Sequence, residues 1–196
     1  MKETYEWIQS WCDETGKHDL PRVLLIGDSI TRSYEGKVRE LLKGKAYVDY
    51  IATSYAIDTK MFATLIDAFY KDDKYALVHF NNGLHGEYVG TRTYAAKLGK
   101  IVRKMTDGKV VLVTSTVVNE NGNKVRHPIW HKIVKARNSA VHAIAGECGY
   151  GVDDLYSVSL SIKKEDRSED GIHYAEGGVN ALADAVAKCI TENLGL

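Results

Sequence analysis

Residues 22–34 read RVLLIGDSITRSY, an apolar run that stops at Gly27-Asp28-Ser29 and continues as a polar segment of helical character. A nearly continuous run of Val, Leu and Ile is typical of a strand buried on both faces. Ser29 would then lie in the first turn of the following helix, where backbone amides point outward and the helix dipole is positive. Asp28, Ser29 or Thr31 can serve there simply as a helix cap, and Ser29 can also serve as a nucleophile.

The remainder of the chain repeats this alternation of strand and helix. Strand-like runs occupy residues 46–52, 75–80 and 109–116, with a weaker one at 150–155, and helical spacing of apolar residues covers 62–69, 94–105, 129–146 and 178–193. Tyr5, Ile8 and Cys12 predict a further, N-terminal helix. Strands alternating with helices predict an α/β protein, a three-layer α/β/α sandwich with a central mostly parallel sheet. We expect one domain over residues 1–196.

The composition limits the classes of partner. The 196 residues include 26 basic and 26 acidic side chains, so no net charge attracts nucleic acid or an anionic membrane. No apolar run approaches the roughly 18 residues that span a bilayer. The charged opening residues lack the apolar centre of a signal peptide, which predicts a cytoplasmic protein, or a secreted or periplasmic one if an export signal has been removed. The oligomeric state stays open.

Metal and disulfide sites have little support in the sequence. Cys12, Cys148 and Cys189 lie far apart, and their odd number argues against a complete disulfide framework. His127 and His131 have a helical spacing that can bind zinc, but no third ligand is evident, which favours two surface side chains. His79 lies inside a strand pattern and is interpreted as a hydrogen-bonded core histidine.

Two polar loops later in the chain are further candidates for the site, and the first lies at a strand end, where open α/β sheets bind their ligands. Asn81 and Asn82 terminate the third run; they are either turn residues or donors to an oxyanion. The loop RSEDGIHYAEGG, residues 167–178, holds Asp170 and His173. A carboxylate at that spacing can reach Nδ1 of the imidazole and leave Nε2 to accept a serine proton. With Ser29, the pair supplies a nucleophile, a base and an orienting acid.

These residues resemble the GDSL or SGNH hydrolase family, in order from about residue 22 to about residue 180. Gly27-Asp28-Ser29 is similar to its first block and Asp170-x-x-His173 to its last. The resemblance implies a flavodoxin-like α/β/α fold, hydrolysis of carboxylic esters, and no metal or organic cofactor. It also implies that Ser29 is the nucleophile and that Asp170 and His173 complete the catalytic triad.

The middle blocks depart from the family pattern. Ser54 stands where the family has a glycine whose amide enters the oxyanion hole. The third block, FNNGLHG, makes Asn81 the expected oxyanion donor, with Asn82 as the alternative. The resemblance therefore implies an oxyanion hole built from the amides of Ser29 and Ser54 and one asparagine side chain.

The expected substrate is a small-molecule or glycan ester with a small acyl group, such as acetyl on a carbohydrate. Asp28, Arg32 and His85 are the candidate substrate-binding residues. The alternative is an α/β domain that binds an anion, a nucleotide or a glycan through the loop at Ser29 without catalysis. The sequence has no GxxxxGK[ST] or GxGxxG motif, which argues against the hypothesis that this loop binds a nucleotide. Intact Ser29, Asp170 and His173 favour the enzyme.

Overall fold

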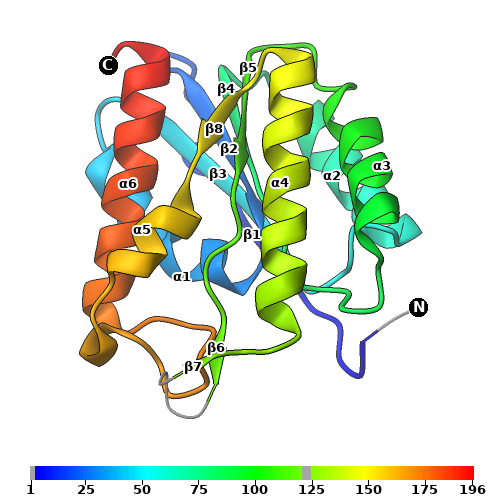
Figure 1. Cartoon of the computed structure of the whole chain (residues 1–196). Coiled ribbons are helices and arrows are strands. Elements are labelled where there is room, and N and C mark those ends of the chain that lie inside the picture. Colours follow the sequence, from blue (N-terminus) through cyan, green and yellow to red (C-terminus); the bar gives the residue numbers. More distant parts are fainter. Residues whose placement is uncertain (1–2, 121–124) are drawn as a thin grey trace.

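The computed structural model describes residues 3–120 and 125–196. Its main sheet has the strand order β1-β3-β2-β4-β5-β8, and all neighbours are parallel except β1 and β3. The strands are β1 (Ile8–Trp11), β2 (Arg22–Gly27), β3 (Tyr47–Thr53), β4 (Leu77–Phe80), β5 (Lys109–Val113) and β8 (Gly151–Asp153). A separate two-stranded ladder joins β6 (Asn119–Glu120) to β7 (Val125–Arg126). Figure 1 shows this sheet between two layers of helices.

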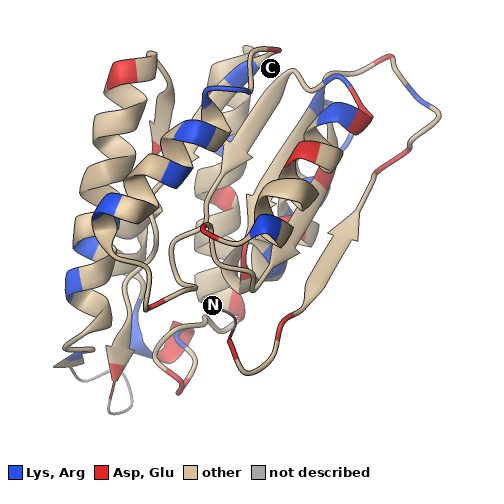
Figure 2. Ribbon diagram, turned by 90° about the vertical axis from the view of Figure 1, so that its right-hand side faces the viewer, with Lys and Arg blue, Asp and Glu red and all other residues tan. Residues whose placement is uncertain are grey.

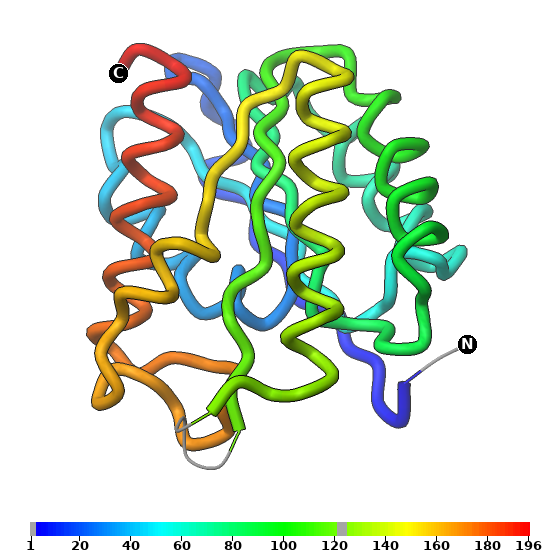
Figure 3. The backbone as a smooth tube through the Cα atoms, viewed as in Figure 1, coloured from blue at the N-terminus to red at the C-terminus, as the bar shows by residue number. Residues whose placement is uncertain are grey.

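Helices cover both faces of the sheet, which confirms the predicted α/β/α fold class. One layer holds α1 (Ser29–Leu41), α5 (Leu155–Ser161) and α6 (Glu176–Leu194). The other holds α2 (Lys60–Asp72), α3 (Thr91–Val102) and α4 (Trp130–Cys148). A short 3-10 helix, Lys164–Asp166, precedes the loop that leads into α6. The tube in Figure 3 follows the chain as it crosses repeatedly from sheet to helix.

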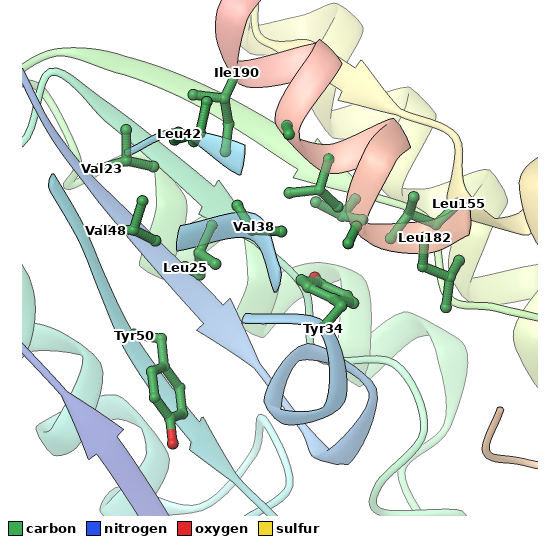
Figure 4. Close-up of a cluster of buried hydrophobic side chains, with 14 of the residues drawn as sticks. Val23, Leu25, Tyr34, Val38, Leu42, Val48, Tyr50, Leu155, Leu182 and Ile190 are labelled. Carbon is green, nitrogen blue, oxygen red and sulfur yellow. The ribbon is translucent and has the colours of Figure 1, made fainter. Parts of the chain in front are cut away.

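Strand β2 lies at the centre of the core because its side chains alternate between two apolar layers. Val23 and Leu25 pack into the cluster beneath α1 and α6, part of which is drawn in Figure 4. Leu24 and Ile26 pack into the cluster beneath α2, α3 and α4. All four are fully buried, as expected for a parallel strand covered on both faces.

The strand order places the end of β2 at a reversal of chain direction. From β2 the chain moves to β3 on one side of it and then to β4 on the other. A crevice forms beyond the carboxyl ends of the strands at such a point, because successive connections leave in opposite directions. Ser29 follows β2 and Asn81 follows β4, so both lie at this reversal.

The N-terminal helix predicted from Tyr5, Ile8 and Cys12 is wrong. Residues 8–11 form β1, an edge strand antiparallel to β3 with Ile8 opposite Thr53 and Trp11 opposite Tyr50. All four residues of β1 are exposed, so the apolar spacing does not mark a buried helical face. The open hydrogen-bonding edge of β3 determines the conformation here, an instance of tertiary context overriding a local pattern.

Three further features bear on the predictions. His79 is fully buried and its Nε2 lies 2.9 Å from Asp153 Oδ2, which confirms a hydrogen-bonded core histidine. Cys12, Cys148 and Cys189 are free and half-buried. None of the described helices has the length and apolar character to cross a bilayer.

In Figure 2, basic and acidic residues both occur on the helices and loops that face the viewer.

Candidate active site

Ser29 is the first residue of α1 and is half-buried, at the reversal of the sheet. The preceding residue, Asp28, is the N-cap, and its Oδ1 accepts a hydrogen bond of 3.0 Å from the Ile30 amide. Asp28 is only 1% exposed. The predicted contact between Asp28 and substrate is therefore replaced by a capping role, because its carboxylate is buried beneath the helix terminus.

A tightly bonded loop carries the other two predicted residues. The Ser168 amide donates to the His173 carbonyl at 2.9 Å, and the Asn119 amide donates to the Gly171 carbonyl at 2.8 Å. Gly171 has a φ of +76°, and a Cβ there would lie 2.2 Å from the Asn119 carbonyl oxygen. Only glycine satisfies both conditions, so the DGIH sequence permits the turn that brings Asp170 back to His173.

Ser29, His173 and Asp170 form a continuous chain of hydrogen bonds. His173 Nε2 lies 2.7 Å from Ser29 Oγ, and His173 Nδ1 lies 2.5 Å from Asp170 Oδ2. Asp170 Oδ1 accepts from the amides of Ile172 and His173 at 2.8 and 2.9 Å. The side chains of His173 and Asp170 are 38% and 46% exposed, so the group is open to solvent.

The protonation of Asp170 assigns the roles of the two ring nitrogens. Burial raises the pKa of Asp170, but hydrogen bonds from the His173 ring and the two amides outweigh it and lower the pKa overall. An ionised carboxylate only accepts hydrogen bonds, so Nδ1 donates to it. In a neutral imidazole Nε2 is then the acceptor, and the Ser29 hydroxyl donates to it. This is the arrangement in which a histidine removes a proton from serine.

The two candidate asparagines differ in what they can reach. Asn82 is 1% exposed, and its Nδ2 donates to the Tyr55 carbonyl at 3.2 Å. Asn81 is half-buried, and its Nδ2 donates to the Val113 carbonyl at 2.8 Å. That amide nitrogen carries a second N–H. Asn81 also lines a cavity of about 10 Å³ shared with Asp28, which has room for a group no larger than one water. The geometry favours Asn81 over Asn82.

Ser54 does not offer the free amide that the family pattern implies. Its N–H donates to the Trp7 carbonyl at 3.2 Å, which continues the ladder between β1 and β3. Its hydroxyl donates to Glu6 Oε2 at 2.7 Å and accepts from the Trp7 amide at 2.8 Å. The prediction of Ser54 as an oxyanion donor is corrected on this point, because the N-terminal segment occupies its amide. The Ser29 amide, as the first of its helix, has no acceptor within the helix.

The N-terminal arm, residues 3–11, contacts two of the candidate substrate-binding residues, which the sequence did not reveal. Glu3 Oε2 lies 3.0 Å from His85 Nδ1, and Glu3 Oε1 accepts from the Gly86 amide at 2.9 Å. The Arg32 guanidinium carbon lies 4.9 Å from the centre of the Trp7 ring, and the His85 ring meets Trp7 edge-on at 6.3 Å. The arm thus connects two predicted substrate-binding residues, Arg32 and His85.

The sequence analysis also missed Arg137, which holds a loop next to the site. It projects from α4, is 1% exposed, and donates to the carbonyls of Gly83, His85, Gly86 and Val89 at 2.6–3.1 Å. Burial lowers the pKa of Arg137, and the nearby Tyr94 opposes that effect. Its guanidinium holds the loop that follows Asn81. An arginine within a helical pattern gives no sign of this role, because a solvated surface residue has the same spacing.

Metal ligands are not grouped in the part of the chain that the structure describes. No set of three His, Cys, Asp or Glu side chains there is arranged to hold an ion. His127 Nδ1 instead accepts a hydrogen bond of 3.3 Å from the Trp130 amide, at the start of α4. The spacing of His127 and His131 therefore reflects the helix terminus.

No family model and no curated protein matches the sequence. Solved structures do share its fold. An acetylxylan esterase from Geobacillus stearothermophilus superposes with a TM-score of 0.68 at 17% identity, covering 90% of this chain and 94% of that one. A lipase/acylhydrolase from Enterococcus faecalis gives 0.68 at 14% identity, covering 88% and 96%.

An alpha/beta hydrolase from the metagenome of Lake Arreo gives 0.68 at 14% identity, covering 87% of this chain and 96% of that one. One structure of the Geobacillus esterase is a catalytic mutant with serine replaced by alanine. At these identities the similarity concerns the fold. The chain therefore has the fold of the SGNH hydrolases, as the blocks at Gly27-Asp28-Ser29 and at Asp170 and His173 predicted.

Proposed function

We propose that this protein is a serine hydrolase of the SGNH type that cleaves carboxylic esters with a small acyl group through an acyl-enzyme intermediate. The observation that carries the proposal is the hydrogen-bond chain Asp170–His173–Ser29, with contacts of 2.5 and 2.7 Å. Its fold is shared with esterases and acylhydrolases. A binding domain has no need for a nucleophile, a base and an orienting acid in contact.

In the first half of the reaction, His173 Nε2 removes the hydroxyl proton as Ser29 Oγ attacks the ester carbonyl carbon. The C–O bond to the alcohol then breaks, and the proton on Nε2 passes to the departing alkoxide. Asp170 stabilises the imidazolium through Nδ1. In the second half, His173 activates a water that attacks the acyl carbon, Ser29 regains its proton and the acid is released.

Two donors support the oxyanion in this proposal. The Ser29 amide lies at the positive end of α1, and Asn81 has a second N–H on its side-chain nitrogen. Removing one such donor typically lowers kcat by about a hundredfold to a thousandfold. Ser54 is left out of this set because its amide is bonded to Trp7.

The expectation of a short acyl group rests on a structural neighbour. The Geobacillus neighbour is described as an acetylxylan esterase. We therefore take an acetyl ester as the substrate class, with a carbohydrate as the alcohol by analogy of fold.

The decisive experiment measures hydrolysis of p-nitrophenyl esters of increasing acyl length by the wild type, Ser29→Ala and His173→Ala. We expect the acetyl ester to be the best substrate and both variants to lose at least about a thousandfold in kcat/KM. Ser33→Ala is the matched control: its hydroxyl, on the same helix, donates to the Ile30 carbonyl at 2.7 Å, so activity should be kept.

A burst of p-nitrophenol equal to the enzyme concentration would support the acyl-enzyme intermediate. Full activity in folded Ser29→Ala would overturn the proposal. Absence of ester turnover in the wild type, together with calorimetric binding of a nucleotide or a glycan, would instead support the non-catalytic alternative.

A further inference from the structure

Arg32 is exposed, lies one helical turn beyond Ser29, and has no carboxylate partner among the residues that the structure describes. Within residues 3–120 and 125–196, the acidic side chain nearest along its helix, Glu35, pairs instead with Arg39 at 3.2 Å. The two carboxylates of the N-terminal arm are also occupied: Glu3 bonds to His85 and Gly86, and Glu6 bonds to Ser54. No described carboxylate therefore balances the charge of Arg32, which is available to a bound group.

Helix geometry makes Arg32 a neighbour of Ser29 on α1. Residues three apart on a helix are neighbours, with about 5–6 Å between their Cβ atoms. Side chains on a helix also lean toward its N-terminus. Since Ser29 is the first residue of α1, Arg32 leans toward the edge of the sheet where Ser29 meets His173.

The Trp7 ring holds the guanidinium in place. The separation of 4.9 Å corresponds to cation–π contact. Trp7 is itself fixed, because its carbonyl accepts from Thr53 Oγ1 at 2.7 Å and its ring meets His85 edge-on. A guanidinium stacked on a fixed ring keeps its in-plane N–H groups for a ligand and loses little conformational freedom on binding.

The two sides of Ser29 are thus built differently. The arm reaches α1 from the side of β3, whereas the loop of His173 contacts Asn119, which follows β5 on the other side of β2. Because Trp7 of the arm holds the Arg32 guanidinium, we expect this charge on the β3 side of Ser29, away from the contact that the His173 loop makes with Asn119.

From this arrangement we infer that Arg32 binds an anionic group, a carboxylate, phosphate or sulfate, carried by the ester substrate. Arg32 then determines specificity: it selects charged esters from neutral ones of the same shape. The inference rests on the proposed esterase function and adds the substrate's charge to it. The anionic group can belong to the acyl part or to the alcohol part, and the two sources are separated by experiment.

The test uses two pairs of esters that differ in one charge. On the alcohol side, 4-acetoxybenzoate is compared with 4-acetoxybenzamide; on the acyl side, monoethyl succinate is compared with ethyl butanoate, both followed by pH-stat. The readout is the ratio of kcat/KM for the charged ester to that for the neutral ester. We expect this ratio to fall by roughly tenfold or more in Arg32→Gln in at least one pair, as for loss of a charged hydrogen bond.

Arg39→Gln is a closely matched control. Arg39 lies two turns further along α1 and stacks on Trp11 of the same arm, with 5.1 Å between the guanidinium carbon and the ring centre. It shares the packing role of Arg32 without the proximity to Ser29, so its ratio should equal that of the wild type. Arg32→Lys keeps the charge but loses the planar guanidinium. Its ratio of kcat/KM values should lie between those of the wild type and Arg32→Gln.

Raising the ionic strength should also lower the wild-type ratio, because an exposed pair is screened by salt. Equal ratios in the wild type and Arg32→Gln for both pairs would overturn the inference while leaving the esterase function intact. An equal fall of the ratio in Arg39→Gln would mean that Arg32 acts only through packing against the arm. That result would also overturn the inference. If the wild type hydrolyses none of the esters, the proposed function fails and the inference fails with it.

Discussion

Replacing Arg137 offers a quantitative test of how the loop after β4 is held. The guanidinium makes four hydrogen bonds to carbonyls between Gly83 and Val89 and lies 5.0 Å from the Tyr94 ring centre. Each hydrogen bond to a charged group contributes about 1.5–3 kcal/mol, but removing a buried cation also relieves a desolvation cost of several kcal/mol. The net loss expected for Arg137→Met is therefore about 3–5 kcal/mol, as for other broken buried charge networks.

The assay for Arg137→Met is urea unfolding at neutral pH together with thermal unfolding. In a chain of this size each kcal/mol lowers Tm by about 2–4 °C, so a fall of about 10 °C is expected. Arg137→Lys retains the charge but has one nitrogen in place of a fork, and should recover only part of the loss. A loss below about 1 kcal/mol in Arg137→Met would refute the reasoning, since it would mean that the loop carbonyls find other donors.

The remaining predictions concern the site and the core. Gly83→Ala should destabilise the fold by about 1–3 kcal/mol, because a Cβ there would lie 1.4 Å from Ser115 Oγ; adding Ser115→Gly should restore most of the unfolding free energy measured in urea. Asp170 has a lowered pKa, so the stability it contributes should be present above its ordinary value of 3.8 and lost as the pH falls through the folded value. The difference in unfolding free energy between wild type and Asp170→Asn should therefore be constant near neutrality and shrink below about pH 4, and a constant difference down to pH 2.5 would contradict this. His79→Leu should cost about 3–5 kcal/mol by leaving Asp153 buried without its partner, and the double variant with Asp153→Leu should unfold at higher urea than the single one.

The fold was predictable because its central strand carries a strong signal. Residues 22–27 are apolar and fully buried, and the change to Asp28 and Ser29 marks the strand end and the helix start. The meeting of Ser29 with His173 was expected from the resemblance of the blocks at Ser29 and His173 to the family, although the loop of His173 follows α5 and a 3-10 helix and not a strand. These signals are local, or depend only on the order of strands and helices.

The parts that failed depend on contacts between distant segments. The conformation of residues 8–11 is determined by the free edge of β3, and the amide of Ser54 is lost to the same pairing. The preference for Asn81 over Asn82 stays a prediction, which the half-burial of Asn81 and the 1% exposure of Asn82 favour. No periodicity or spacing in the sequence reports such partners.

The pairing of β1 with β3 also affects how the protein behaves toward other copies of itself. Strand β3 is buried along all seven residues, whereas β1, which covers its outer edge, is exposed along all four. At the opposite end of the sheet, β8 spans only three residues. An open, apolar strand edge is a template for pairing with another chain, and short or covered edges suppress it. Proteolytic removal of residues through Trp11 would expose the edge of β3, so the trimmed protein should aggregate during refolding under conditions in which the full chain stays monodisperse.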